Sequence, residues 1–305
     1  MNILVFGRGA IGTQYGWALE NAGHKVDFFV RKGRIKDYGN TVSLDIYDTR
    51  SKKQIKENWQ INLKEEIEED KTYDLILLSV NPEQVEGALL QVKRFAKNAT
   101  VFFFCNYGLE VKAAVKDFPA DQIVFGFPGA GGGYEGNALG GIMYNFFQLG
   151  QAGAKLSERE SFVKKIFSDA GFKVKIQENI EEWLLNHYVA NAAMEAEVLK
   201  AGSFKAVASS KKLLGQMVLN IREMTPYVKA KGFHPDALIK ALNILPADFV
   251  GSLMKNLVYK ESGPAYKALA FNHYKVGYSV MQIINDAHLL GIETPRLEAA
   301  YNAEK

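Results

Sequence analysis

Glycines at fixed spacing near the start of the chain could bind the phosphates of a dinucleotide. The run GRGAIG at 7–12 has the form GxGxxG. In such a run the first glycine allows a tight turn, the second lets a pyrophosphate approach the backbone, and the third lets a helix pack closely on a strand. The N–H groups and dipole at the start of that helix attract the phosphates. We therefore predict dinucleotide contacts at Gly7, Arg8, Gly9, Ala10, Ile11 and Gly12.

The elements around this motif are those that a dinucleotide-binding turn requires. An apolar run at 2–6 precedes the glycines, a helical pattern continues to about Ala22, and a second apolar run at 26–30 follows. A glycine-rich turn without a ligand is the alternative interpretation. The order strand, glycine turn, helix and strand favours nucleotide binding.

The residues after the second apolar run favour NADPH over NADH. Proteins that bind NAD usually carry Asp or Glu about 20 residues after the glycines, bonded to the ribose 2′-hydroxyl. Here the run leads into the basic segment 31–34 (RKGR), and the nearest acid, Asp27, lies inside the run. Guanidinium and ammonium groups suit a 2′-phosphate, although a solvated basic loop would look the same. We predict that Arg31 contacts the cofactor.

Composition and charge exclude several classes of protein. The 305 residues carry a net charge of +3, too small to indicate binding to nucleic acid or to an anionic membrane. The single cysteine, Cys105, reads as a buried structural thiol, and no histidines have the spacing of metal ligands. No apolar run approaches the roughly 20 residues of a membrane span, and the first strand begins without a signal peptide. We expect a cytoplasmic protein with a small-molecule partner, and a homodimer stays open.

Hydrophobic patterning divides the chain into two parts. In the first part apolar runs alternate with helical patterns, which indicates an α/β domain with a Rossmann-type parallel sheet. The second part shows almost only helical periodicity, which indicates an all-helical domain. We predict a nucleotide-binding domain over 1–178 and a helical substrate domain over 179–305. Helices are expected in the second part over 204–231, 235–244, 246–258 and 270–290.

Two segments of the first part depart from the alternation. The alternating pattern of 41–48 followed by 60–63 predicts a small antiparallel excursion. The run PGAGGG at 128–133 predicts a loop, in which glycine would let the backbone approach a ligand near Gly131. A flexible loop without a ligand is an equal alternative.

Ligands of an open parallel sheet bind beyond the carboxyl ends of its strands. Asn81 and Asn106 follow two of the predicted strands. Asn81 could contact the adenosine or the ribose, and the amide of Asn106 could bond a ribose or the carboxamide of nicotinamide. Asn81 precedes Pro82, for which capping a helix is the stronger interpretation. Asn106 has the role of a turn residue as its alternative.

A polar stripe on the first helix of the second domain is the candidate catalytic surface. Trp183, His187, Asn191 and Met194 share one helical face by their spacing. Two-domain dehydrogenases bind substrate in the cleft between domains, and carbonyl reduction needs a polarising group and a proton source. His187 could supply both because its reference pKa is about 6.5. A structural histidine is the alternative.

These features resemble the ketopantoate reductases (2-dehydropantoate 2-reductases) over essentially the whole chain. The similar segments are NILVFGRGAIGTQYG, AGHKV, the basic residue after the second strand, DLILLSV, the turn from Asn106 to Gly108, the glycines near 129–133, and HLLGIETP. The resemblance implies an α/β domain that binds NADPH and a helical domain that offers a lysine acid, amides and a serine to the substrate. It carries the cofactor role over to the glycine run, Arg31 and Asn106, and less securely to Gly131.

In the catalytic half the chain departs from the family pattern. The family's lysine on the first helix of the second domain falls at Trp183, and one substrate asparagine falls at His187, whereas the other is retained as Asn191. By the same resemblance Ser252 matches the substrate serine, and a late glutamate falls at Lys275. An indole N–H releases no proton at neutral pH, so another group must act as the acid.

We therefore predict an NADPH-dependent oxidoreductase that reduces a 2-oxo acid or a related carbonyl compound. His187 or Lys275 would be the acid, and Asn191 and Ser252 would orient the substrate. Trp183 favours a bulkier or less polar substrate than ketopantoate. The alternatives are genuine ketopantoate reduction in pantothenate biosynthesis, a non-catalytic NADP(H)-binding sensor, and another kind of Rossmann dehydrogenase.

Overall fold

The chain folds into two units, which we describe separately. The computed structural model describes residues 1–107 and 110–303. The first unit comprises Met1–Asn106 and Glu110–Ile180, and the second comprises Tyr107–Leu109 and Glu181–Lys305. Among the helices of the described ranges, none has the length and apolar character needed to cross a membrane.

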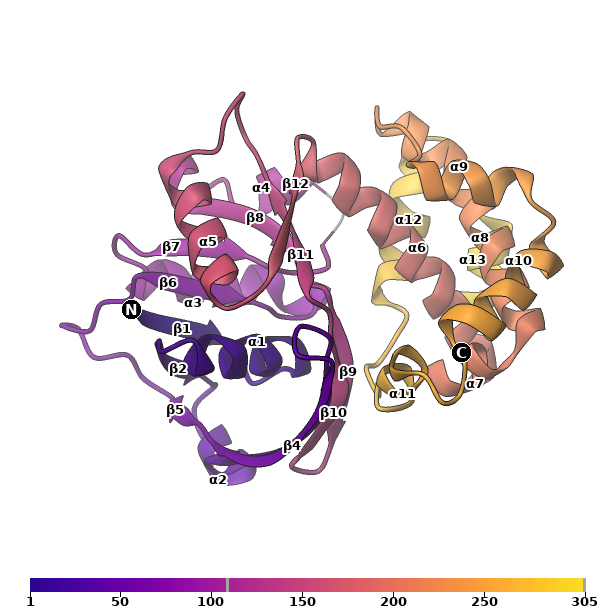
Figure 1. The fold of residues 1–305 in the computed structure, drawn as a ribbon. Coiled ribbons are helices and arrows are strands. Elements are labelled where there is room, and N and C mark those ends of the chain that lie inside the picture. Colours follow the sequence, from indigo (N-terminus) through magenta and orange to yellow (C-terminus); the bar gives the residue numbers. More distant parts are fainter. Residues whose placement is uncertain (108–109, 304–305) are drawn as a thin grey trace. The chain divides into compact units, whose positions relative to one another are not determined.

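An eight-stranded sheet forms the centre of the first unit, in the order β12-β11-β8-β7-β6-β1-β2-β5 (Figure 1). Six adjacent strands, in the order β5-β2-β1-β6-β7-β8, run parallel to one another. This is the Rossmann order 3-2-1-4-5-6. This result confirms the predicted fold class. The strands are β1 (Asn2–Phe6), β2 (Lys25–Phe29), β5 (Asn62–Lys64), β6 (Leu75–Leu78), β7 (Thr100–Phe103), β8 (Ile123–Phe127), β11 (Phe146–Gly150) and β12 (Lys173–Gln177).

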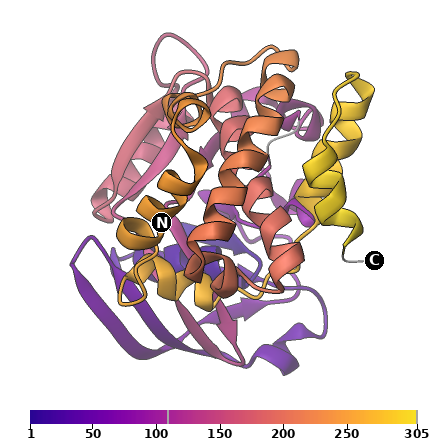
Figure 2. The same cartoon turned by 90° about the vertical axis from the view of Figure 1, so that its right-hand side faces the viewer.

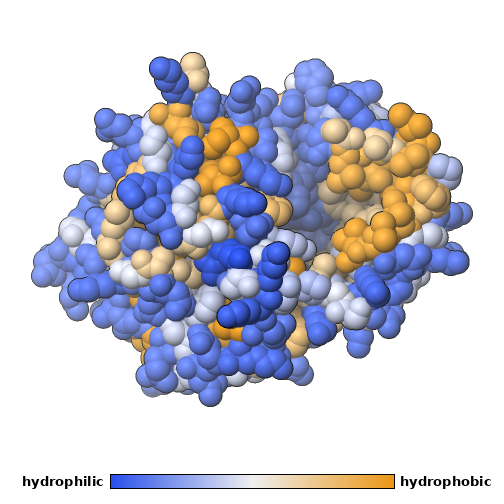
Figure 3. Space-filling model, in the orientation of Figure 1, coloured by the Kyte–Doolittle hydropathy of each residue, from blue (hydrophilic) through white to orange (hydrophobic). Residues whose placement is uncertain are grey.

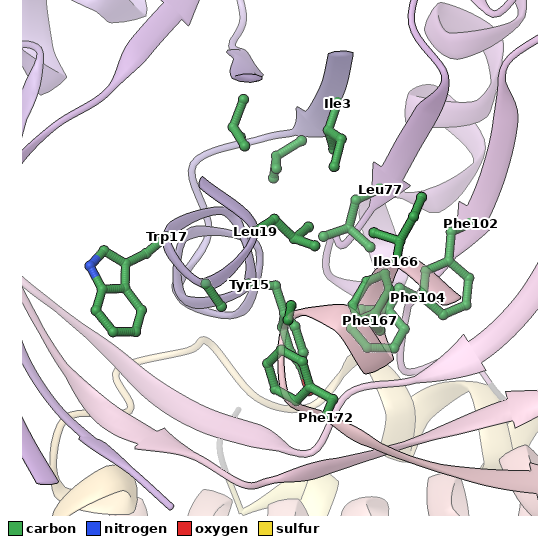
Figure 4. Close-up of a cluster of buried hydrophobic side chains, with 14 of the residues drawn as sticks. Ile3, Tyr15, Trp17, Leu19, Leu77, Phe102, Phe104, Ile166, Phe167 and Phe172 are labelled. Carbon is green, nitrogen blue, oxygen red and sulfur yellow. The ribbon is translucent and has the colours of Figure 1, made fainter. Parts of the chain in front are cut away.

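The central strands are almost entirely apolar, as expected where helices cover both faces of a sheet. Every residue of β6 and β7 is buried, as expected for parallel strands packed on both faces. Aromatic side chains fill the core beside α1, where Tyr15, Phe104 and Phe167 pack together (Figure 4). The helices of this unit are α1 (Ala10–Asn21), α2 (Arg34–Tyr38), α3 (Val85–Phe95), α4 (Val111–Ala114) and α5 (Glu158–Asp169).

A second sheet, in the order β4-β3-β10-β9, packs on α1. Its strands are β3 (Thr41–Asp48), β4 (Lys53–Gln60), β9 (Ala130–Glu135) and β10 (Ala138–Met143). The predicted antiparallel excursion exists, but the partner of β3 is β4. The segment expected to be that partner, 60–63, instead contributes β5 to the main sheet.

The prediction of a loop at 128–133 was wrong, because most of this segment is β9. Its glycines allow close approach between strands rather than flexibility. A Cβ at Gly132 would lie 2.2 Å from the carbonyl oxygen of Gly140, and one at Gly141 would lie 2.4 Å from that of Gly131. Gly132 also has a φ of +144°, which side chains rarely allow.

Helices make up the described part of the second unit (Figures 1 and 2). The long helix α6 spans Ile180–Ala201 and contributes Tyr188, Val189 and Ala192 to a buried core. The other elements are α7 (Phe204–Ser209), α8 (Lys211–Ala230), α9 (Ala237–Ile244), α10 (Ala247–Leu253), a π-helical turn (Met254–Val258), α11 (Pro264–Ala270), α12 (Tyr278–Leu289) and α13 (Pro295–Asn302).

Two of the predicted helices are interrupted. The helix expected over 204–231 is divided at Ser210, whose hydroxyl caps α8 by accepting a bond from the N–H of Leu213. The helix expected over 270–290 begins only at Tyr278, because Gly277 has a left-handed φ of +111°. Lys275 therefore lies in the connection between α11 and α12.

Candidate functional site

Two glycines of the GRGAIG run have the structural roles that the sequence predicts. Gly7 ends β1 with a φ of +93°, which turns the chain toward α1. A Cβ at Gly12 would lie 2.8 Å from Cγ1 of Val5, so only glycine lets α1 pack this closely on β1. Ala10 and Ile11 form the half-buried start of α1.

Gly9 differs from Gly7 and Gly12 because no packing contact within the protein requires a glycine at this position. Its φ of −73° suits any residue, and the nearest neighbour of an added Cβ would be the carbonyl oxygen of Ser79 at 3.7 Å. Gly9 is the N-cap of α1 and offers no side chain to its first N–H groups. These donors are therefore suited to an external anion.

Arg8 is buried between two aromatic rings that the sequence did not reveal as its partners. Its Cζ lies 5.0 Å from the ring centroid of Tyr38 and 4.5 Å from that of Tyr134. Its Nη2 donates to Oδ1 of Asn137 at 2.5 Å, whereas its Nε is buried without a hydrogen-bond partner. Arg8 thus links the glycine turn to the β9–β10 hairpin and keeps one donor unused.

Asp27 is occupied by structural contacts inside β2. Its carboxylate accepts bonds from the hydroxyl of Tyr73 at 2.8 Å and from the amide of Asn62 at 2.5 Å. Nζ of Lys71 lies 3.4 Å away. These three partners hold the carboxylate of Asp27 within the first unit.

The loop after β2 presents basic side chains. Arg31 and Lys32 are exposed, and Cζ of Arg34 lies 4.8 Å from the ring centroid of Tyr38, the ring that Arg8 also contacts. Glu65 accepts a bond from the N–H of Ile35 at 2.8 Å. Backbone donors at Ile35 and its neighbours lower the pKa of this carboxyl. Glu65 therefore holds α2 and the basic loop before it.

Asn106 follows β7 and carries an unused acceptor. Its Oδ1 is buried without a hydrogen-bond partner, while Gly108, the end of the predicted turn, lies outside the described residues. The preceding Cys105 is buried, and its Sγ donates to the carbonyl of Leu78 at 3.1 Å. Burial raises the pKa of this thiol to about 12, which confirms a structural cysteine.

Asn81 and Gly131 have identifiable local roles. Asn81 is exposed and precedes a 3-10 turn at Pro82–Gln84, and its N–H donates to Oε1 of Gln84 at 3.4 Å. The helix-cap interpretation is thus the one that the local geometry supports. Gly131 lies inside β9, where its carbonyl accepts a bond from the amide of Gln14 on α1 at 3.2 Å.

The polar stripe forms the less buried face of α6. Trp183, His187 and Asn191 are half-buried, whereas the residues between them on the other faces are mostly buried. The rings of Trp183 and His187 stack with centroids 5.1 Å apart and an interplanar angle of 9°. Burial lowers the pKa of His187 to about 4. The imidazole is therefore neutral at pH 7 and has no extra proton to give.

The remaining catalytic candidates lie on other elements of the second unit. Ser252 is half-buried on α10, and Lys275 is exposed. Two residues after Lys275, the N–H of Gly277 donates to Oε2 of Glu195 at 3.3 Å. Glu195 is buried on α6, one turn beyond Asn191. This contact anchors the segment that carries Lys275 to the helix that carries the polar stripe, and no sequence pattern indicates it.

Within the ranges 1–107 and 110–303, no cluster of three or more His, Cys, Asp or Glu side chains could hold a metal ion.

The first unit has a Rossmann-type fold with a glycine turn after β1, and the second unit is helical. Residues 3–138 match the family model described as ketopantoate reductase PanE/ApbA. This part of the chain is thus similar to the ketopantoate reductase family. A comparison with curated protein sequences gives no significant match.

Solved structures share the fold over nearly the whole chain. A D-mandelate dehydrogenase in complex with NADH and anilino(oxo)acetate is 18% identical with a TM-score of 0.73, covering 100% of this chain and 97% of that one. The 2-dehydropantoate 2-reductase of Porphyromonas gingivalis W83 is 12% identical (TM-score 0.69, coverage 99% and 98%). A PanE/ApbA family ketopantoate reductase of Ralstonia eutropha JMP134 is 18% identical (TM-score 0.70, coverage 99% and 96%). At these identities the likeness shows that the chain shares the fold of these proteins.

Proposed function

We propose that this protein is an NADPH-dependent oxidoreductase that reduces a 2-oxo acid or a related carbonyl compound. The observation that carries the proposal is the glycine turn, in which Gly9 is required by no contact within the protein. Nearby elements hold two buried polar atoms without partners, Nε of Arg8 and Oδ1 of Asn106. Unpaired buried groups are costly, so a bound ligand that meets them would explain their retention.

The residues of the first unit fit a nicotinamide dinucleotide, which supplies a hydride when bound. The backbone of the glycine run and the start of α1 would hold the pyrophosphate. Oδ1 of Asn106 would accept a bond from a ribose hydroxyl or from the carboxamide. We assign cofactor binding to the domain over 1–178 and substrate binding to the domain over 179–305.

NADPH is the form that the charges around β2 favour. Asp27, the nearest acid, is held by Tyr73, Asn62 and Lys71 and would not bind the 2′-hydroxyl. Arg31 and Lys32 extend from the end of β2 into solvent and would meet a 2′-phosphate, which guanidinium groups bind in bidentate geometry. A D-mandelate dehydrogenase with the same fold was solved in complex with NADH. The preference for NADPH therefore has to be tested against NADH.

In the second unit, Lys275 is the better candidate for the acid. A neutral His187 would donate a hydrogen bond to the substrate oxygen, whereas an ammonium group can also deliver a proton. Glu195 would keep the Lys275 segment at α6 through its bond to Gly277. Asn191 and Ser252 would orient the carboxylate or hydroxyl groups of the substrate.

Turnover of NADPH with a panel of carbonyl compounds tests this proposal. The panel would contain ketopantoate, 2-oxo acids with aliphatic and aromatic side chains, and aldehydes, with NADPH binding measured on the same sample. We expect oxidation of NADPH by at least one 2-oxo acid. Cofactor binding without turnover of any compound would contradict the enzyme and favour the second candidate below.

Two protein variants, assayed with the best substrate of the panel, test which residue is the acid. Lys275→Met should lower kcat by about 100-fold or more, the usual loss when a well-placed charged donor is removed. Lys260→Met, which removes another exposed lysine of the second unit, is the matched control and should keep full activity. Full turnover by the Lys275→Met variant would reject this lysine as the acid.

A non-catalytic NADP(H)-binding sensor is the second candidate. It is favoured by Trp183, whose indole releases no proton at neutral pH, and by the pKa of His187, which burial lowers to about 4. Trp183→Lys separates the candidates further, because an ammonium group there would restore ketopantoate reduction if the rest of a reductase site is intact. Genuine ketopantoate reduction would appear directly in the panel with the unmodified chain.

We also propose a cytoplasmic location. NADPH is a cytoplasmic reductant, and a single unpaired cysteine, Cys105, matches a compartment that keeps thiols reduced. Fractionation of cells that produce the protein would test this expectation.

A further inference from the structure

Glu65 brings a carboxylate to the basic loop over 31–34, which we assign to the cofactor. It follows β5, the strand that pairs in parallel with β2, and Lys64 at the end of β5 lies opposite Phe29 at the end of β2. The N–H of Val30 donates to the carbonyl of Lys64 at 2.8 Å. The two strands therefore end together, and Glu65 lies at the edge of the sheet where ligands bind.

The carboxylate of Glu65 is held by backbone donors around the start of α2. Its Oε1 accepts a hydrogen bond from the N–H of Ile35 at 2.8 Å. This N–H lowers the pKa of the carboxyl most, followed by the N–H groups of Gly33 and Arg34 and by the charge of Lys32. Glu65 is therefore ionised at neutral pH and adds a negative charge to the basic loop.

Other acids also pair with the basic side chains of this region. Nζ of Lys32 lies 3.7 Å from Oε1 of Glu66, and Nη1 of Arg34 donates to Oδ2 of Asp37 at 2.8 Å. Figure 3 shows mostly hydrophilic residues at the lower left, where Figure 1 places β5 and α2. The basic loop thus carries its own counter-charges at a surface where salt screens them.

A buried polar group beside this region has an unused donor. Arg8 is only 8% exposed, and its Cζ lies 5.0 Å from the ring centroid of Tyr38, the ring that Arg34 also contacts. Within residues 1–107 and 110–303, Nε of Arg8 has no hydrogen-bond partner. A buried donor without a partner is costly, which indicates that a ligand oxygen binds here.

We propose that Glu65 is a specificity-determining residue of the cofactor site, which weakens the binding of NADPH relative to NADH. From β5 it supplies the acid that the end of β2 lacks. Its carboxylate repels the 2′-phosphate of NADPH, whereas it can accept a hydrogen bond from the 2′-hydroxyl of NADH. Arg31 acts in the opposite direction, so the cofactor preference is the balance of these two residues. This inference rests on the proposed function.

Titration of the wild type and of Glu65→Gln with NADPH and NADH tests the inference. The glutamine keeps an acceptor for the N–H of Ile35 and removes the charge. We expect NADPH affinity to rise about 3- to 10-fold, the size expected for the loss of one like charge near the surface, whereas NADH affinity should not rise. The gain should shrink in about 1 M salt, where the Debye length is about 3 Å, and a structural effect would not follow this screening.

Two further variants frame the result. Glu66→Gln releases Lys32 from its ion pair and should raise NADPH affinity by a smaller factor. Glu69→Gln is the matched control, because it removes an exposed acid of the same segment whose backbone carbonyl is bound by Lys97. It should change neither affinity. Thermal melts would show that each variant is folded.

The outcomes separate this inference from the proposed function. An unchanged or lower ratio of NADPH to NADH affinity in folded Glu65→Gln would overturn the inference, while NADPH binding by the wild type would leave the proposed function intact. If Glu65→Gln does not fold, the same ratio in Glu66→Gln decides. A wild type that binds neither cofactor would refute the proposed function and the inference with it.

Discussion

The glycine turn of the first unit and the polar face of α6 in the second unit are built in different ways. The turn is shaped by its backbone, because Gly7 has a positive φ and Gly12 lies against Val5. On α6, separate side chains must meet, and their partners come from distant segments, as in the contact of Glu195 with Gly277. A site made of backbone tolerates sequence divergence, whereas a site made of side chains can be rebuilt one residue at a time.

The largest effect on stability should come from the substitution of Asp27. It tests whether this residue stabilises the first unit or binds the cofactor. Asp27→Ala would leave the Tyr73 hydroxyl, the Asn62 amide and Lys71 without their shared acceptor. We expect a loss of about 2–4 kcal/mol in the free energy of unfolding, measured by urea denaturation. NADPH affinity of the folded variant should change little. A large loss of affinity with unchanged stability would show that Asp27 binds the ribose after all.

Acidification should destabilise the protein through His187, whose side chain is half-buried on α6. The pKa of His187 is lowered to about 4, below the value of about 6.5 expected in the unfolded chain. The unfolded state therefore takes up the proton first, so stability is full above about pH 6.5 and falls as the pH drops toward 4, by at most about 3 kcal/mol. In His187→Gln, the melting temperature should depend less on pH across this window. Identical pH profiles would contradict the burial of this ring.

The next prediction contrasts two glycines of one turn. Gly12→Ala should cost about 1–3 kcal/mol, because its Cβ would collide with Val5 in a packed core. Gly9→Ala has room for its Cβ, so stability should stay within about 0.5 kcal/mol. NADPH affinity should nevertheless fall about tenfold or more, because the methyl group would occupy the path of the pyrophosphate. Unchanged affinity in the folded Gly9→Ala variant would remove the main support for cofactor binding at this turn.

Fold and cofactor elements were predictable from the sequence where local rules apply. Continuous apolar runs gave the parallel strands, and the spacing of the glycines gave the turn between β1 and α1. Register was harder, because β3 pairs with 53–60 rather than 60–63, and the alternating pattern of 41–48 does not specify its partner. The glycines of β9 look like those of a loop in the sequence. Their role depends on the close approach of Gly140 from the neighbouring strand, which is a tertiary contact.

The polar stripe was predictable, but its chemistry was not. Helical spacing places Trp183 and His187 on one face of α6, and the structure stacks their rings. The low pKa of His187 follows from burial, which a helical pattern does not quantify. The break at Gly277, which frees the Lys275 segment from a helix, depends on a single positive φ.

The smallest expected effect concerns Cys105, which follows β7 and directly precedes Asn106. Its thiol is buried and its pKa is raised to about 12, so thiol reagents should label it only after unfolding. Cys105→Ala should cost about 1 kcal/mol through lost packing and leave NADPH affinity unchanged. Rapid labelling of the native protein would contradict this assignment.

Titration of the protein with NADPH and NADH, for the wild type and Arg31→Ala, tests the central claim most directly. We predict tighter binding of NADPH by the wild type. In Arg31→Ala, NADPH affinity should fall by about 10- to 100-fold, the value of a charged hydrogen bond to phosphate, while NADH affinity stays the same. Lys36→Ala, which removes an exposed charge from α2, serves as the control. Equal affinities for the two cofactors would refute the NADPH preference, and no binding of either would contradict the cofactor site itself.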